Sequence, residues 1–144
     1  MKTIVIQLLA AFAGSLGFSL LFGMRRRYLL AASLAGALAW GVYLAVDAWL
    51  GAPFLSCLLA AAAAALYAEL LARALKSPAT LFVIPAILPL VPGGSLYYAM
   101  SSAVRGDMAA ARDYGSQTLE AALAIAAGIS FVMVIRQLRT RRAP

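Results

Sequence analysis

The stretch that decides the fold is PATLFVIPAILPLVPGG, which runs from Pro78 to Gly94. It is almost entirely apolar, as a membrane-spanning segment must be, yet it contains four prolines and ends in two glycines. An internal proline removes a backbone N–H donor and clashes with the preceding turn of a helix. Hydrocarbon cannot replace the lost hydrogen bond, so such backbone persists in a membrane only where protein packs on it or where it lines a wet cavity. The stretch therefore predicts a broken membrane-spanning helix, and helices of this kind build the solute sites of many transporters.

The composition places the chain among integral membrane proteins. Of its 144 residues 65% are hydrophobic, and the mean hydropathy is +0.92, which is too apolar for a soluble domain of this length. The single cysteine, Cys57, excludes a disulfide framework, and the absence of histidine leaves no cluster with metal-ligand spacing, so we expect no metal and no cofactor. The net charge of +7 does not predict a nucleic-acid partner, because the basic residues stand in short runs between apolar segments.

Five segments are long and apolar enough to cross a membrane, for which about 20 residues are needed. They are residues 3–23, 28–46, 53–72, 78–104 and 115–135. The fourth is expected to break near residues 92–94. The first ends at three arginines, Arg25 to Arg27, which is typical of a retained helix and not of a cleaved signal peptide. The sequence thus predicts an all-α integral membrane protein in which residues 1–144 form a single transmembrane domain.

The distribution of basic residues predicts the orientation of these five crossings. With the N-terminus outside, nine basic residues lie on the inner side: Arg25, Arg26, Arg27, Arg73, Lys76, Arg136, Arg139, Arg141 and Arg142. Only three lie on the outer side: Lys2, Arg105 and Arg112. Because cytoplasmic loops carry an excess of lysine and arginine, we expect the N-terminus outside and the C-terminus inside. A re-entrant fourth segment would place the basic tail outside, so the count also favours a complete crossing.

The residues that follow the prolines are candidates for a substrate site. Three internal prolines are expected to break the fourth span: Pro85, Pro89 and Pro92. Gly93 and Gly94 come next, and glycine readily adopts backbone angles that other residues avoid. Ser95 is then placed to cap a second half-helix that runs to about residue 104. The free N–H groups and the positive dipole end of such a half-helix favour an anion such as a carboxylate.

A stripe of polar side chains follows this predicted helix start. At 3.6 residues per turn, one narrow face contains Ser95, Tyr98, Ser102 and Arg105. We interpret this face as one wall of a polar path, because polar groups inside a membrane are usually functional. The alternative is structural: the hydroxyls hydrogen-bond the backbone carbonyls that the prolines leave without donors.

The carboxylate of Glu120 lies one or two turns inside the fifth span, where it is costly unless it is paired, hydrated or protonated. It is a candidate to carry protons, to bind a cation, or to pair with Arg105 or Arg112. The structural alternative is that its side chain reaches back to the membrane interface.

Other polar side chains within the spans have simpler interpretations. Glu69 and Arg73 are four residues apart near the inner end of the third span, and this spacing predicts a structural ion pair across one helical turn. Tyr43 and Tyr67 are interpreted as aromatic residues of the membrane interfaces.

Small residues recur at a spacing of four, which lets helix backbones approach closely in lipid. The pairs are Ala10/Gly14, Ala13/Gly17, Ala37/Gly41 and Ala124/Gly128. They are expected either to pack inside the bundle or to contact another subunit, and the sequence does not decide between the two.

The segment from about Ala68 to Tyr98 resembles the small membrane subunit of the threonine/serine exporter family. The resemblance is carried by Glu69, Arg73, Lys76, Pro78, Ala79, Phe82, Ile84, Pro85, Pro89, Leu90, Val91, Pro92, Gly93, Gly94 and Tyr97, with weaker agreement at Gly106, Asp107 and Glu120. One departure is Ala86, where the family pattern has glycine. The resemblance implies export of small carboxylate-bearing metabolites, either threonine and serine or dicarboxylates such as succinate. It also implies a multi-pass protein of the bacterial cytoplasmic (inner) membrane that works with a larger partner subunit of the same family.

These patterns favour one function and leave others open. The first hypothesis is a subunit of a secondary exporter of small amino acids or dicarboxylates, with Glu120 or Arg105 tuning charge or coupling protons. The alternatives are a nontransporting membrane scaffold, for which the small-residue faces would mediate assembly or a homo-oligomer, and a channel-like pore. We expect no enzyme, because no histidine, metal constellation or activated nucleophile is present.

Overall fold

The computed structural model describes residues 2–141 as a set of helices without a strand in that range. In chain order these are α1 (Lys2–Leu21), α2 (Arg26–Leu50), α3 (Pro53–Leu75), α4 (Thr80–Ile87), the 3₁₀ helix η1 (Leu88–Leu90), α5 (Gly93–Val104) and α6 (Met108–Arg141). Arg142 of the predicted basic tail lies outside the described residues. The all-α fold is therefore confirmed.

Four helices of the described range, α1, α2, α3 and α6, are long and apolar enough to cross a membrane. A fifth crossing is reached if α4, η1 and α5 together form one bent span. The prediction of five spans agrees with the upper count, and the orientation across the membrane stays a prediction.

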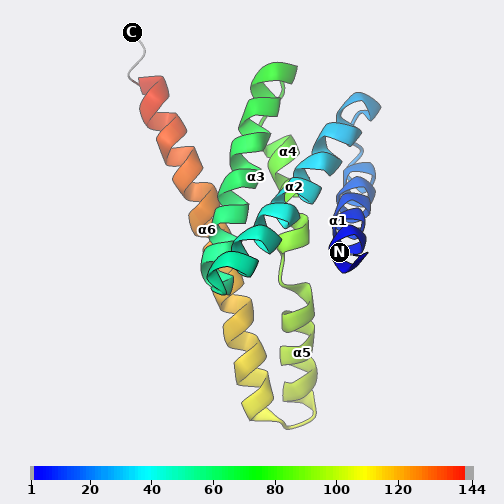
Figure 1. The fold of residues 1–144 in the computed structure, drawn as a ribbon, viewed down its shortest axis with the longest axis vertical. Helices are drawn as coiled ribbons and strands as arrows, with labels where there is room; N and C mark the ends of the chain where they lie inside the picture. The colour runs from blue at the N-terminus through cyan, green and yellow to red at the C-terminus, as the bar shows by residue number, and fades with distance from the viewer. Residues whose placement is uncertain (1, 142–144) are drawn as a thin grey trace.

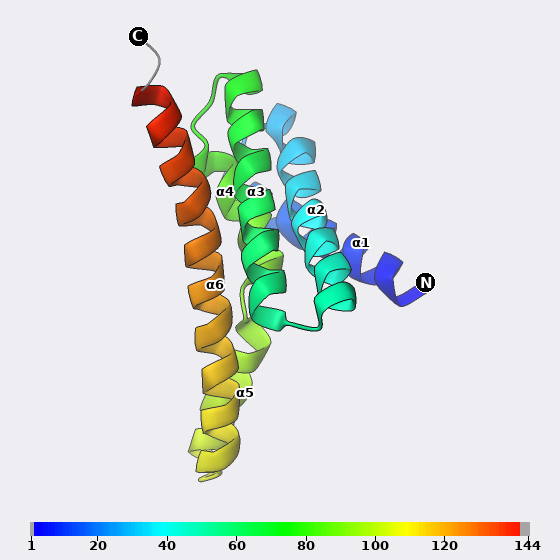
Figure 2. The same cartoon turned by 60° about the vertical axis from the view of Figure 1, so that its left-hand side comes forward.

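The elements form a bundle from which one hairpin projects (Figure 1, Figure 2). Helices α1 to α4 pack together, and the second half of α6 packs along α3. Helix α5 lies beside the first half of α6, beyond the turn that joins α2 to α3. The 34 residues of α6 give it a length of about 51 Å, whereas the hydrocarbon core of a bilayer is about 30 Å thick.

Helix α6 begins seven residues before the predicted span, so the predicted mixed loop is mostly helical. Gly106 adopts a φ of +81°, a left-handed conformation that suits glycine and ends α5 abruptly. Asp107 then accepts a hydrogen bond from the Ala110 N–H through its carboxylate at 3.0 Å, which caps the new helix. Helix α2 is also longer than predicted, and it includes Asp47, whose carboxylate accepts a weak hydrogen bond from Ser56 at 3.4 Å.

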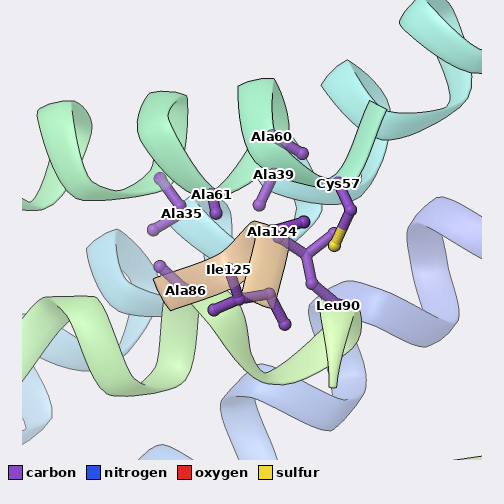
Figure 3. Close-up of a cluster of buried hydrophobic side chains, with 10 residues drawn as sticks. Ala35, Ala39, Cys57, Ala60, Ala61, Ala86, Leu90, Ala124 and Ile125 are labelled. Atoms are coloured by element: carbon purple, nitrogen blue, oxygen red, sulfur yellow. The ribbon is translucent and has the colours of Figure 1, made fainter. Parts of the chain in front are cut away.

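The bundle core is built largely from alanine, which lets the helices approach closely (Figure 3). One buried cluster contains Ala35, Ala39, Cys57, Ala60, Ala61, Ala64, Ala86, Leu90, Ala124 and Ile125. Gly128 of α6 fits against α3 so closely that an added Cβ would lie 2.5 Å from the Leu58 carbonyl oxygen. The pair Ala124/Gly128 therefore packs inside the bundle, whereas Ala10/Gly14 and Ala13/Gly17 are exposed on α1.

Candidate functional site

The predicted break in the fourth span is present, and the two parts of the span meet at a bend of 54°. It falls at Val91 and Pro92, one residue earlier than predicted. Val91 is extended, with φ −61° and ψ 125°, because proline disfavours helical backbone in the residue before it. Gly93 and Gly94 belong to the first turn of α5 and neither has a positive φ, so Pro92 makes the break and the glycines do not. Pro85 was also expected to break the span, but it lies inside α4.

A serine from α1 repairs the backbone that the prolines disrupt. Pro89 has no N–H to donate to the Pro85 carbonyl one turn earlier. The Ser15 hydroxyl, fully buried, donates to that carbonyl at 2.9 Å. Gly36 of α2 covers this contact so closely that an added Cβ would lie 1.9 Å from the Ser15 Oγ. The sequence suggested that hydroxyls of α5 would bond the carbonyls left without donors by the prolines. For the Pro85 carbonyl, Ser15 of α1 makes this bond instead.

The N-terminal end of α5 keeps unsatisfied backbone donors. The Ser95 hydroxyl donates to the Pro92 carbonyl at 3.3 Å, so Ser95 does not cap the helix, contrary to the prediction. The Gly93 N–H donates to Val91 and the Leu96 N–H to Pro92. Within residues 2–141 the N–H groups of Gly94 and Ser95 have no acceptor, which leaves two donors at the positive end of the helix dipole.

A cavity of about 380 Å³ opens beside the break. It lies between α2, α3, the broken span and α6, and it is open on one side. Its lining consists of Trp40, Tyr43, Pro53, Phe54, Cys57, Pro89, Leu90, Val91, Pro92, Ser95, Gln117, Glu120 and Ala121. The structure thus brings together four of the predicted site residues: Pro89, Pro92, Ser95 and Glu120.

Polar groups reach this cavity from different elements. The indole N–H of Trp40 is buried and has no hydrogen-bond partner among the described residues. The Trp40 ring stacks on Tyr43 with centroids 5.0 Å apart, which fixes its orientation. Gln117 and Glu120 enter from α6, and both are exposed in the isolated chain. The lining thus combines Ser95, at the positive end of α5, with the Glu120 carboxylate of α6.

The remaining residues of the predicted stripe do not line the cavity. Tyr98 packs against Tyr114 of α6 with ring centroids 5.5 Å apart. Ser102 is buried where α5 contacts α6, and Arg105 is exposed at the end of α5. Helices α5 and α6 form a hairpin, so the stripe on α5 faces α6. Ser95, the first residue of the stripe, is the one that lies at the break.

The predicted ion pair has a different partner. The Glu69 carboxylate is buried and pairs with Arg136 of α6 at 2.7 Å, not with Arg73. Helical spacing made Arg73 the nearest candidate along the sequence, but the close packing of α3 on α6 places Arg136 nearer to the Glu69 oxygen. The ion pair therefore links α3 to α6 and does not link two turns of α3.

Nine of the lining residues were not predicted as site residues, and three of these carry an indole, phenol or amide group: Trp40, Tyr43 and Gln117. Trp40 carried a usable signal, since an indole N–H near the middle of a span needs a partner. Tyr43 looked like an interfacial aromatic, and Gln117 lay just inside the predicted fifth span without any feature to distinguish it.

Comparison with known families gives one match. The model of the family described as Threonine/Serine exporter, ThrE, matches residues 7–135. No curated protein and no solved structure gives a significant match. Because the family match covers most of the chain, including the broken span and the cavity lining, this protein belongs to the threonine/serine exporter family.

Proposed function

We propose that this chain is a subunit of a secondary exporter and that the cavity beside the break binds a small amino acid of the threonine and serine class. The family membership supports an exporter-type transporter. The single observation that carries the proposal is the cavity itself, because it opens where the span breaks and collects unpaired polar groups. In secondary transporters that work by alternating access, discontinuous membrane-spanning helices usually form the substrate site.

The polar lining favours a zwitterion. The free N–H group of Ser95, at the positive end of α5, suits a carboxylate, and a small rotation of the Trp40 ring would add the indole N–H. Glu120 suits an ammonium group. A dicarboxylate such as succinate would bring a second negative charge toward Glu120, so the lining favours an amino acid over a dicarboxylate.

A larger subunit of the same family, which the sequence resemblance implies, would close the open side of the cavity. The projecting hairpin of α5 and α6 supports this assembly, since it carries large apolar side chains that this chain leaves exposed: Leu96, Tyr97, Met100, Val104 and Leu119. The complex would reside in a bacterial cytoplasmic membrane with the N-terminus of this chain outside.

Replacing Glu120 by glutamine tests the site. We expect E120Q, produced with its partner subunit, to lower the export of labelled threonine about tenfold or more, because a charge-assisted hydrogen bond to the ammonium group is lost. The matched control is D113N, which removes a carboxylate from the same helix outside the cavity. Unchanged efflux in E120Q, with both variants inserted at equal levels, would remove the cavity from consideration. Full transport by the partner subunit alone would instead identify this chain as a scaffold.

A further inference from the structure

A second groove, of about 360 Å³, runs between α3 and α6. Its walls repeat at helical spacing on both helices, and they are formed by Ala62, Ala63, Leu66, Glu69, Leu70 and Arg73 of α3 and by Phe131, Val132, Ile135 and Arg136 of α6. The charged lining residues are Glu69 and Arg73 of α3 and Arg136 of α6, and on each helix they lie toward the C-terminal end of the lining. The groove is thus an apolar channel with a basic end.

The apolar part of the groove opens outward. Leu66 and Leu70 are 55% and 57% exposed, and Phe131 is 65% exposed. All three lie on helices that are long and apolar enough to span a membrane, so lipid can reach these side chains wherever no other subunit covers them. A hydrocarbon chain is therefore the natural occupant of this part of the groove.

The charged side chains of the groove lining are Glu69, Arg73 and Arg136. Glu69 is only 5% exposed and binds one guanidinium N–H of Arg136 at 2.7 Å, which holds that arginine at the mouth of the groove. Arg73 is exposed beside them and has no ion-pair partner among the described residues. The Arg73 guanidinium therefore offers this end of the groove a charged group that can bind one phosphodiester.

The position of this end in the molecule agrees with an anionic headgroup. The end of α3, the turn between α1 and α2 and the end of α6 all lie at the same end of the bundle (Figure 1). That turn contains Arg25 and is followed by two more arginines, and Lys76 follows α3. Clusters of basic residues at helix ends bind anionic lipids. Each basic residue near the membrane surface contributes about 1 kcal/mol to the binding free energy.

We propose that the α3–α6 groove is a binding site for an anionic phospholipid. One acyl chain lies along Leu66, Leu70 and Phe131, and the phosphodiester contacts the guanidinium group of Arg73. The site lies on the opposite end of α3 from the cavity beside the break, so it does not depend on the proposed substrate.

Native mass spectrometry of the purified full-length chain tests this site, with dioleoyl phosphatidylglycerol as the probe. We expect retention of the lipid to be about fivefold weaker in R73Q, because one basic contact is lost. R105Q is the matched control, since Arg105 is equally exposed but ends α5 at the far end of the molecule. A63F, which fills the groove and leaves the charges in place, should also weaken retention.

Three further outcomes decide the proposal. Dioleoyl phosphatidylcholine, which has no net charge, should bind more weakly than phosphatidylglycerol, and inorganic phosphate should not displace the bound lipid. Equal retention of the two lipids would overturn the anionic site. Equal loss in R73Q and R105Q would show that the lipid binds to surface charge in general and not to the groove, provided that circular dichroism shows both variants to be folded.

Discussion

At the scale of single residues, the unpartnered indole N–H of Trp40 makes a specific prediction. Phenylalanine keeps an aromatic ring for stacking on Tyr43 but removes the N–H donor and has a smaller ring. We expect W40F to raise the threonine concentration needed for half-maximal export about tenfold, as is typical for a lost hydrogen bond to a charged group.

Concentration-dependent efflux from vesicles that contain the complex measures this effect. W49F is the control, because Trp49 is 91% exposed and does not line the cavity beside the break. Identical concentration dependence in W40F and the unmodified chain would show that the indole does not touch the substrate.

Ser15 of α1 stabilises the broken span through its hydrogen bond to the Pro85 carbonyl. Alanine at this position leaves the Pro85 carbonyl buried without a donor, and we expect S15A to lower the free energy of unfolding by about 1 kcal/mol. Denaturant titration in detergent measures the change. S116A serves as the comparison, since the Ser116 hydroxyl bonds a carbonyl of its own exposed helix turn and should cost much less. Equal effects would mean that the α1 hydroxyl is not needed for the break.

At the scale of helices, α6 approaches α3 closely at Gly128, where a glycine faces the backbone of the other helix. A methyl group on Gly128 would lie 2.5 Å from the Leu58 carbonyl oxygen, so the two helices must separate to admit it. We expect G128A to destabilise the fold by about 1–3 kcal/mol.

Gly115 of the same helix provides the matched control for thermal unfolding in detergent. An added Cβ at Gly115 meets nothing within 4 Å, so G115A should be neutral or slightly stabilising through helix propensity. Similar unfolding temperatures for G128A and G115A would contradict the close approach of α3 and α6.

The helices themselves were predictable from sequence, because spans are read from length and apolar content, which are local properties. The break was predictable for the same reason, although Val91 and Pro92 form it and not the glycine pair. Partners across the bundle were not predictable: Glu69 finds Arg136 and Pro85 finds Ser15, at separations of 67 and 70 residues. The cavity follows from those pairings, so only Pro89, Pro92, Ser95 and Glu120 of its lining were named in advance.

At the scale of the whole molecule, the charge distribution predicts how the bundle sits in the membrane. The N-terminus outside places the α5–α6 hairpin outside and the end of α3 inside. In intact cells we expect an impermeant maleimide to label cysteine in D113C but to label K76C only after lysis. The native Cys57 is buried and should contribute little background. The reverse labelling pattern would invert the orientation.

The straightness of α6 has a mechanical consequence. Gly128 is held against α3, and it stands eight residues from Glu120 in one direction and eight from Arg136 in the other. Each arm is about 12 Å long on a continuous helix. If α6 tilts about its contact at Gly128, Glu120 beside the break and Arg136 at the other end move by equal amounts in opposite directions. Widening one end of the molecule then narrows the other.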